Sequence, residues 1–263
     1  MKAPHKLDLY RLAVQHPCAE VAFVHKVFTH YHPRRRATRL REDFAGTCAL
    51  ATQWVAEHMD HRAMAIDLHA PALRWAWARA KRVLGTRADD LHLVNDDVMN
   101  ITTPRVDAVI ATNFSTYVWR DRDALRAYFS VARRSLDERG VLVIDTYGGP
   151  SAMRIGVQRR TVVPPRTESI APFEYQWEQR SYDAVTGRID CRIHFKIRGK
   201  QLRNAFVYDW RLWTLPELIE VMREAGFADA EVWCDDENRP GYYRCMNRLP
   251  NRSEWVAYVV GVK

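Results

Sequence analysis

The sequence contains no long apolar segment. None of its apolar runs approaches the roughly 18 to 20 residues that a membrane-spanning helix needs. The residues that follow Met1 also lack the apolar stretch of a signal peptide. Internal repeats and low-complexity segments are absent as well. These absences favour a cytoplasmic protein that has no membrane as its partner.

Cysteine is scarce and irregularly spaced. The five cysteines include no Cys-x-x-Cys pair, and they stand at Cys18, Cys48, Cys191, Cys234 and Cys245. An odd number without paired spacing does not indicate a disulfide framework or a structural zinc site. No other grouping of histidines, cysteines and carboxylates has the spacing of metal ligands. We therefore expect reduced thiols and no bound metal.

Acidic residues are outnumbered by basic ones. The 263 residues carry a formal net charge of +8 with a pI near 9.4, and five arginines fall between Arg34 and Arg41. A basic chain can bind nucleic acid or another anion. A generally arginine-rich composition is the alternative, since no long basic tract stands apart from the folded pattern. The charge alone leaves both interpretations open.

Strands and helices alternate through most of the chain. Residues 7–31 have helical apolar spacing that Pro17 interrupts, and short apolar strands then alternate with amphipathic helices. This order predicts an α/β fold in which a Rossmann-like, seven-stranded sheet has helices on both faces. We expect an N-terminal helical cap over residues 1–35 and an α/β core over residues 36–150 and 214–263.

A different pattern interrupts this order over residues 151–213. Apolar and polar residues alternate from Phe173 to Trp213, which is the period of strands with one buried face. Turn residues separate these runs near Gly187 and Gly199. The segment predicts an antiparallel β meander that is inserted into the core and forms a lid over its site.

A tight turn between the first expected strand and its helix is the first sign of a binding site. Gly46 lies in the segment Phe44-Ala-Gly-Thr-Cys48. A glycine there lets a ligand approach the backbone and the free N–H groups of the next helix. A dinucleotide site usually has three glycines at this turn. Phe44 and Cys48 stand where two of them would be, which argues against NAD or FAD and favours a smaller ligand.

Carboxylates follow the next two expected strands. Asp67 comes 21 residues after Gly46, close to the spacing of a carboxylate that accepts ribose hydroxyls. Capping of the helix near Pro71 is the alternative, although Asp67 lies too far upstream for a natural cap. Asp96 and Asp97 follow the third strand, where an acid can accept the amino group of adenine. A solvated turn is the alternative for this pair.

Aromatic residues follow the fourth expected strand. Asn113, Phe114 and Tyr117 lie at the edge where open α/β sheets bind ligands. An uncharged polar residue with neighbouring aromatic rings can border a cationic centre. Packing in the core is the alternative for Phe114 and Tyr117.

Taken together, these positions resemble the class I S-adenosylmethionine-dependent methyltransferases. The resemblance covers about residues 36–150 and 214–262. It extends to a bacterial subgroup of the family through the segments Leu40-Arg-Glu-Asp-Phe, Trp177-Glu-Gln and Tyr208-Asp-Trp-Arg-Leu-Trp213. It implies S-adenosylmethionine as the cofactor. The implied cofactor-binding residues are Glu42, Phe44, Ala45, Gly46, Asp67, Leu68, Asp96, Asp97, Val98, Asn113 and Phe114.

The sequence departs from the family pattern at the glycine turn. Phe44 and Cys48 replace glycines, so the family pattern does not define how the carboxylate of the methionine part is held. Arg41 and Thr47 are the candidates for this contact.

The resemblance implies methyl transfer by in-line displacement to a small molecule. Catalysis would consist mainly of positioning, because the methyl donor is already activated. A general base is needed only for a weak, protonated nucleophile. The candidate catalytic residues are Tyr147, Tyr208 and His16. The candidate substrate-binding residues are Tyr10, Tyr117, Tyr147, Tyr175, Trp177 and Trp210. For the rings of the meander, packing between meander and sheet is the alternative.

Other functions stay open. An RNA methyltransferase would suit the net charge of +8, although Asn113-Phe-Ser115 lacks the prolines of many enzymes that methylate adenine amino groups. The altered glycine turn disfavours a nicotinamide-dependent reductase. A non-catalytic binding domain would keep the fold without methyl transfer. The expected assembly is a monomer or a homodimer.

Overall fold

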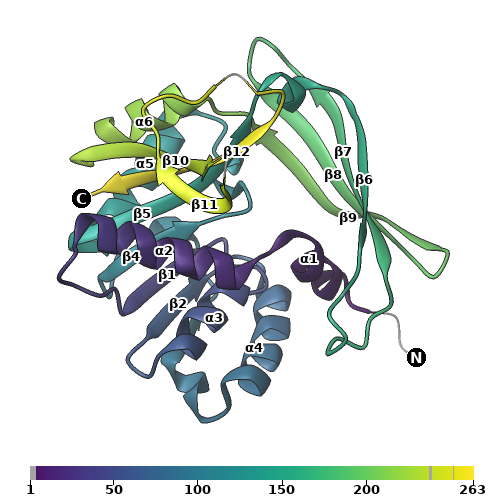
Figure 1. Cartoon of the computed structure of the whole chain (residues 1–263), viewed down its shortest axis with the longest axis horizontal. Coiled ribbons are helices and arrows are strands. Elements are labelled where there is room, and N and C mark those ends of the chain that lie inside the picture. Colours follow the sequence, from purple (N-terminus) through teal and green to yellow (C-terminus); the bar gives the residue numbers. More distant parts are fainter. Residues whose placement is uncertain (1–3, 237–238, 251) are drawn as a thin grey trace.

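Two separate β-sheets and six α-helices make up the described part of the chain (Figure 1). The structure is a computed structural model that describes residues 4–236, 239–250 and 252–263. An eight-stranded sheet forms the centre, and a four-stranded antiparallel sheet stands beside it. The predicted α/β fold with a separate antiparallel sheet is confirmed. None of the helices described is long and apolar enough to cross a membrane.

The central sheet has the strand order β11-β10-β12-β5-β4-β1-β2-β3. Strands β1 to β5 pair in parallel, whereas β12 pairs antiparallel to β5, β10 to β12 and β11 to β10. The strand bounds are β1 Arg39–Asp43, β2 Arg62–Ile66, β3 Leu91–Val94, β4 Val106–Ala111, β5 Leu136–Gly148, β10 Asp229–Asp236, β11 Arg239–Cys245 and β12 Trp255–Val262.

The prediction of seven strands was wrong by one, because the described residues form eight. The added strand is β11, which pairs only with β10 at the edge of the sheet. Its sequence contains Pro240 and Gly241, which are typical of turns. An edge strand tolerates proline because one side of its backbone needs no partner. The pattern of residue types therefore hid this strand.

Helices cover both faces of the central sheet. Helices α2, α3 and α4 pack on one face, where Val24, Trp54 and Leu73 belong to a common core. Helices α5 and α6 pack on the other face with Phe129 and Leu218. The helix bounds are α1 Lys6–Val14, α2 Pro17–Tyr31, α3 Ala49–Glu57, α4 Ala70–Leu84, α5 Arg122–Ser135 and α6 Leu215–Glu224. The two cores leave the carboxyl ends of the parallel strands as the edge where a site can form.

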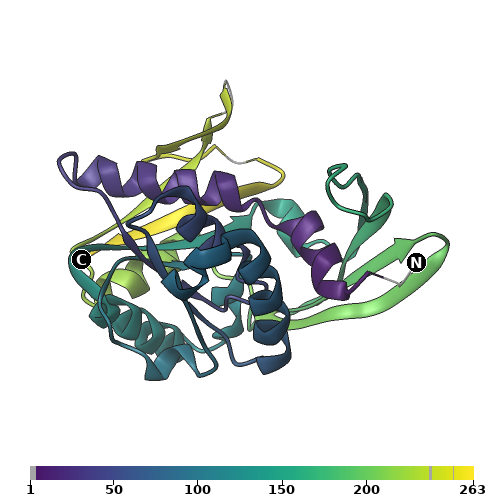
Figure 2. The same ribbon diagram turned by 90° about the horizontal axis from the view of Figure 1, so that it is seen from below.

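The four-stranded sheet is inserted between β5 and α6. Its strands are β6 Gly156–Val162, β7 Phe173–Tyr182, β8 Arg188–Ile197 and β9 Lys200–Arg211. Helix α1 packs on this sheet through Leu9 and Ala13, which share a core with Phe195. Figure 2 shows the dark purple α1 between the helices of the central layer and the inserted sheet. The N-terminal helical segment thus divides, because α2 joins the central sheet and α1 joins the inserted one.

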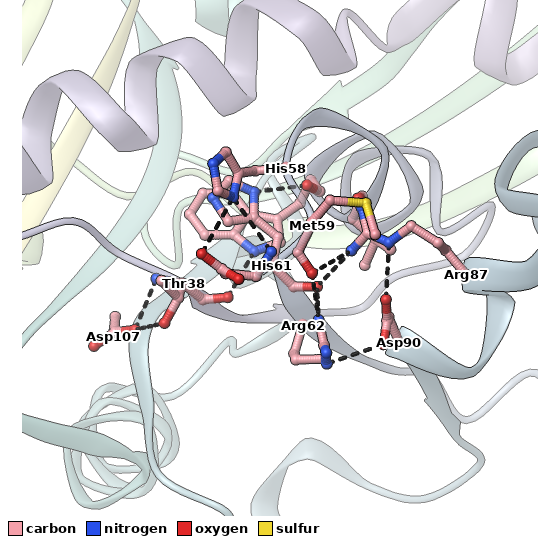
Figure 3. Close-up of polar contacts among 11 residues, drawn as sticks. Thr38, His58, Met59, His61, Arg62, Arg87, Asp90 and Asp107 are labelled. Atoms are coloured by element: carbon pink, nitrogen blue, oxygen red, sulfur yellow. Dashed lines mark hydrogen bonds and ion pairs between the residues drawn. The ribbon is translucent and has the colours of Figure 1, made fainter.

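A polar network ties together the starting edges of the parallel strands (Figure 3). The carboxylate of Asp107 accepts the backbone N–H of Thr38 at 2.9 Å. The guanidinium of Arg87 pairs with Asp90 at 2.9 Å and donates to the backbone carbonyl of Met59 at 3.2 Å. These contacts lie at the edge opposite to the ends of the strands. We therefore assign them to stability.

A fully buried ion pair lies inside the central layer. Arg41 and Asp43 on β1 have side-chain exposures of 1% and 0%, and the Arg41 Nε–Asp43 Oδ1 distance is 2.6 Å. The guanidinium also donates to the Ser135 hydroxyl at 2.6 Å and to the carbonyl of Val98 at 2.9 Å. The hydroxyl of Tyr128 donates to Asp43 at 3.0 Å. This network joins β1 to α5 and to the segment after β3.

Asp43→Asn should destabilise the fold strongly, because it leaves the Arg41 charge buried without its partner. Loss of one partner of a buried pair costs about 3–5 kcal/mol of unfolding free energy, which urea denaturation measures. Glu224→Gln is the control, because its pair with Arg122 is exposed and should leave stability nearly unchanged. Equal effects of the two variants would contradict this assignment.

Candidate functional site

The turn after β1 adopts a glycine-like conformation at all three positions of the pattern. Phe44, Gly46 and Cys48 have φ values of +54°, +50° and +52°. This left-handed region costs a side-chain-bearing residue about 1–2 kcal/mol. Replacement of glycine by Phe44 and Cys48 therefore adds strain, and the turn still keeps its path. The backbone N–H of Cys48 closes the turn by donating to the carbonyl of Ala45 at 2.7 Å.

Asp67 holds this turn from the end of β2. Its Oδ2 accepts the backbone N–H of Gly46 at 2.7 Å, and its Oδ1 accepts that of His69 at 2.7 Å. The cap of α4 is His69, whose Nδ1 accepts the N–H of Ala72 at 3.1 Å. Asp67 therefore does not cap α4, as its position in the sequence indicated. The next side chain, Leu68, is 70% exposed, which is unusual for an apolar residue beside a candidate site.

The two acids after β3 have different environments. Asp97 caps a short 3-10 helix by accepting the N–H of Met99 at 2.9 Å. Asp96 accepts hydrogen bonds from Asn100 at 2.9 Å and from the backbone of Asp97 at 2.6 Å, and these bonds lower the pKa of Asp96. Val98 is buried. Asp96 is thus an ionised, accessible carboxylate near the end of β3, whereas Asp97 is engaged in the local turn.

A carboxylate that the sequence analysis missed holds the turn after β4. Asn113 and Phe114 both have φ of +60°. The carboxylate of Asp145 on β5 accepts both of their backbone N–H groups, at 2.8 and 2.7 Å. Burial raises the pKa of Asp145 to about 7. Asp145 follows the apolar run 141–144 as Asp67 follows that of β2, and this parallel was the available signal.

Glu42 and Arg41 at the end of β1 have distinct roles. The Oε2 of Glu42 accepts the N–H of Ala51 at 2.8 Å, at the start of α3. Burial raises the pKa of Glu42 to about 8. Arg41 is turned away into its pair with Asp43. The prediction that Arg41 contacts the carboxylate of a cofactor was therefore wrong, because its guanidinium is fully used inside the layer.

A cavity of about 840 Å³ opens between the strand ends and the inserted sheet. Its walls come from α1, from the segments after β4 and β5, from β6 to β9, and from the start of β12. Aromatic side chains dominate the walls. They are Tyr10, Phe114, Tyr147, Tyr175, Trp177, Tyr208, Trp210 and Trp255. Asn113 also lines the cavity, so the turn after β4 borders both this space and the turn around Gly46.

Most of the candidate substrate residues line this cavity, but two aromatic or basic candidates do not. Tyr117 is fully buried, and its hydroxyl bonds Thr146 Oγ1 at 2.6 Å and the carbonyl of Tyr147 at 3.0 Å. It therefore supports Tyr147 from behind. His16 is exposed at the start of α2 and is not part of the cavity wall. The structure gives neither residue a direct substrate contact.

Hydroxyl groups of the cavity wall are neutral. The hydroxyl of Tyr208 donates to that of Tyr10, which links β9 to α1. The hydroxyl of Tyr147 is buried without a hydrogen-bond partner. Burial raises the pKa of each of these three tyrosines above its usual range. None of them is a base at neutral pH.

Ionisable groups of other kinds are confined to the rim. The charged residues that line the cavity are Arg154, Arg160 and Glu254, and all three are exposed. Arg160 stacks on Tyr175 at 4.9 Å and donates to the backbone of α1. No histidine, lysine or cysteine of the described chain lines the cavity. The arrangement can orient a ring-shaped molecule but offers no buried base.

Asp145→Ala should lower the free energy of unfolding by about 2–4 kcal/mol, because two backbone N–H groups lose a carboxylate acceptor. Asp145→Asn retains one carbonyl acceptor and should cost about half as much. Urea denaturation of both variants measures the effect. An unchanged stability of Asp145→Ala would mean that the turn at Asn113 and Phe114 needs no such support.

The fold of this chain is shared by solved structures of S-adenosylmethionine-dependent methyltransferases. One such methyltransferase from Clostridium acetobutylicum has a TM-score of 0.70 and 16% identity, over 98% of this chain and 96% of that chain. The sugar N-methyltransferase KedS8 from Streptoalloteichus has a TM-score of 0.66 and 20% identity, over 100% and 95%. CalS10 from Micromonospora echinaspora, an amino pentose methyltransferase with bound S-adenosylmethionine, has a TM-score of 0.65 and 17% identity, over 98% of both chains.

Comparisons by sequence give no relative. No family model matches the chain, and no curated protein resembles it in sequence. The structural likeness extends over nearly the whole length of each chain, inserted sheet included. The chain therefore has the fold of the class I S-adenosylmethionine-dependent methyltransferases.

Proposed function

We propose that the protein transfers the methyl group of S-adenosylmethionine to a small molecule. One observation carries the proposal: the turn around Gly46 and the acids Asp67 and Asp96 lie at successive strand ends, beside an aromatic cavity that shares Asn113 and Phe114. A related fold binds this cofactor in CalS10. The exposed side chain of Leu68 beside Asp67 offers an apolar surface for an adenine ring.

The residues present fit each part of this cofactor. Asp67 is placed to accept ribose hydroxyls, and Asp96 is an ionised acceptor for the adenine amino group. Asn113 and Phe114 border the region between this cradle and the cavity. The chemistry supplied by the bound cofactor is an activated methyl group on a sulfonium centre. The protein then needs to orient the acceptor and exclude water.

The inserted sheet and α1 supply the enclosure. Trp177 and Trp210 come from two strands of this sheet, and their ring centroids lie 6.2 Å apart. Tyr10 reaches the cavity from α1 and packs on Phe206 of the sheet at 4.7 Å. We propose that the sheet and α1 together act as the lid of the acceptor site.

An amine nitrogen is the acceptor that this wall suits best. A hydroxyl nucleophile needs a base in the transition state, and the described lining offers none away from the rim. A neutral amine attacks with its own lone pair and gives up its proton to water afterwards. Aromatic faces also stabilise the positive charge that develops on nitrogen. KedS8, with the same fold, is named a sugar N-methyltransferase, which supports this choice.

Asp67→Ala should weaken binding of S-adenosylmethionine about 10- to 100-fold, because two hydroxyls lose a charged acceptor. Isothermal titration calorimetry measures the dissociation constant. Asp60→Ala is the control, since Asp60 is exposed after α3 and far along the chain from the strand ends. Undiminished binding by Asp67→Ala would refute the assignment of the ribose site.

Transfer of a labelled methyl group should favour amines over the matching alcohols. The assay uses a panel of cyclic amines, sugar amines and aromatic amines beside their hydroxyl counterparts, with tRNA as a further acceptor. Trp177→Ala should raise the KM of an amine acceptor about tenfold, since a large buried ring contact is lost, and should leave cofactor affinity unchanged. Labelling of alcohols alone, or of tRNA alone, would reject an amine acceptor.

A further inference from the structure

Gln15 is a buried polar residue whose hydrogen-bonding capacity is only half used. It ends α1 and is 8% exposed. Its Oε1 accepts the hydroxyl of Thr47, which lies in the turn around Gly46. Its amide nitrogen makes no hydrogen bond within the described residues. A buried amide that donates to nothing has lost its water without replacement, which normally costs free energy.

The position of this amide fits the part of the cofactor that lacks a partner. The methionine end of S-adenosylmethionine carries a carboxylate, and Arg41 is unavailable because it is sealed in its pair with Asp43. The contact with Thr47 places Gln15 against the turn that approaches the ligand. An amide N–H is a suitable neutral donor to a carboxylate.

Glu20, one turn into α2, is a second buried polar residue without a cationic partner. It is 9% exposed, and its carboxyl group accepts the backbone N–H of His16. Glu42 on β1 and Asp145 on β5 both feel its charge. The other ionisable groups that face it are Tyr10 on α1, Tyr243 on β11 and Tyr258 on β12.

No cation balances this acidic group. The charges that act on Glu20, Glu42 and Asp145 include no lysine or arginine of the described chain. Burial raises the pKa of Glu20 to about 7 and that of Glu42 to about 8. Buried carboxyls without a counter-ion take up a proton rather than stay ionised. A bound cation would replace these protons.

We propose that the junction of α1 and α2 forms the amino-acid end of the cofactor site. In this assignment the amide of Gln15 donates to the carboxylate of the cofactor, and Glu20 together with Glu42 pairs with its ammonium group. The assignment rests on the proposed function, because it assumes that this cofactor binds at the turn around Gly46. It gives the N-terminal segment a direct part in recognition.

A pH dependence follows from the carboxyl groups. Glu20 and Glu42 have pKa values above the ordinary range, so both are largely protonated at pH 6 and must ionise to pair with the ammonium. Binding therefore releases protons, and the affinity should rise from pH 6 to pH 8. A ligand without the amino-acid part should show no such rise.

Two probes that share one nucleoside test the assignment by calorimetry on the full chain. S-adenosylhomocysteine carries the amino-acid part, and 5′-methylthioadenosine lacks it. Gln15→Ala should weaken S-adenosylhomocysteine about tenfold, because a hydrogen bond to a charged group is lost, and should change 5′-methylthioadenosine less than about twofold. Glu20→Gln should have the same selectivity and should reduce the rise in affinity from pH 6 to pH 8.

Gln53→Ala is the matched control, because the amide of Gln53 on α3 contacts an exposed Glu57. It should leave both probes unchanged. Should Glu20→Gln fail to fold, the wild-type protein still tests the proposal through the difference in pH dependence between the two probes. Equal losses for both probes, no loss for either, or equal pH dependence would overturn the assignment. Failure of the wild type to bind either probe would instead refute the proposed function itself.

Discussion

The hydrogen bond from the backbone N–H of Gly46 to the carboxylate of Asp67 is the constraint on which the site depends. It joins the turn after β1 to the end of β2 at 2.7 Å. The turn is strained, since Phe44 and Cys48 occupy the left-handed region without being glycine. Strain of this kind persists only where surrounding contacts outweigh it. The same carboxylate that stabilises the turn is thereby placed where a ribose can reach it.

The principle recurs at the other strand ends. Asp145 holds the left-handed pair Asn113 and Phe114, and Glu42 accepts a backbone N–H at the start of α3. Each acid fixes a turn and at the same time brings negative charge to the edge of the sheet. A cationic cofactor suits that edge better than a pyrophosphate, which would need positive groups. Arg41, the basic residue nearest in sequence, is removed into the layer by Asp43.

The sequence predicted the alternating layers well, because buried strands and amphipathic helices leave strong periodic patterns. The spacing from Gly46 to Asp67 followed from the same regularity. Edge strand β11 escaped because its Pro240-Gly241 pair resembles a turn, and exposed β6 escaped because it has no buried face. Arg41 and Asp145 could not be assigned from sequence alone, since their partners are set by tertiary packing rather than by local spacing.

The central claim is that the strand ends bind S-adenosylmethionine rather than a nicotinamide dinucleotide. Thermal unfolding of the full chain in the presence of S-adenosylmethionine, S-adenosylhomocysteine, NAD or NADP tests it most directly, because a ligand that binds only the folded state raises the melting temperature. The account predicts a saturable rise with the first two ligands and none with the dinucleotides. A rise with NAD or NADP alone, or with no ligand at all, would contradict it.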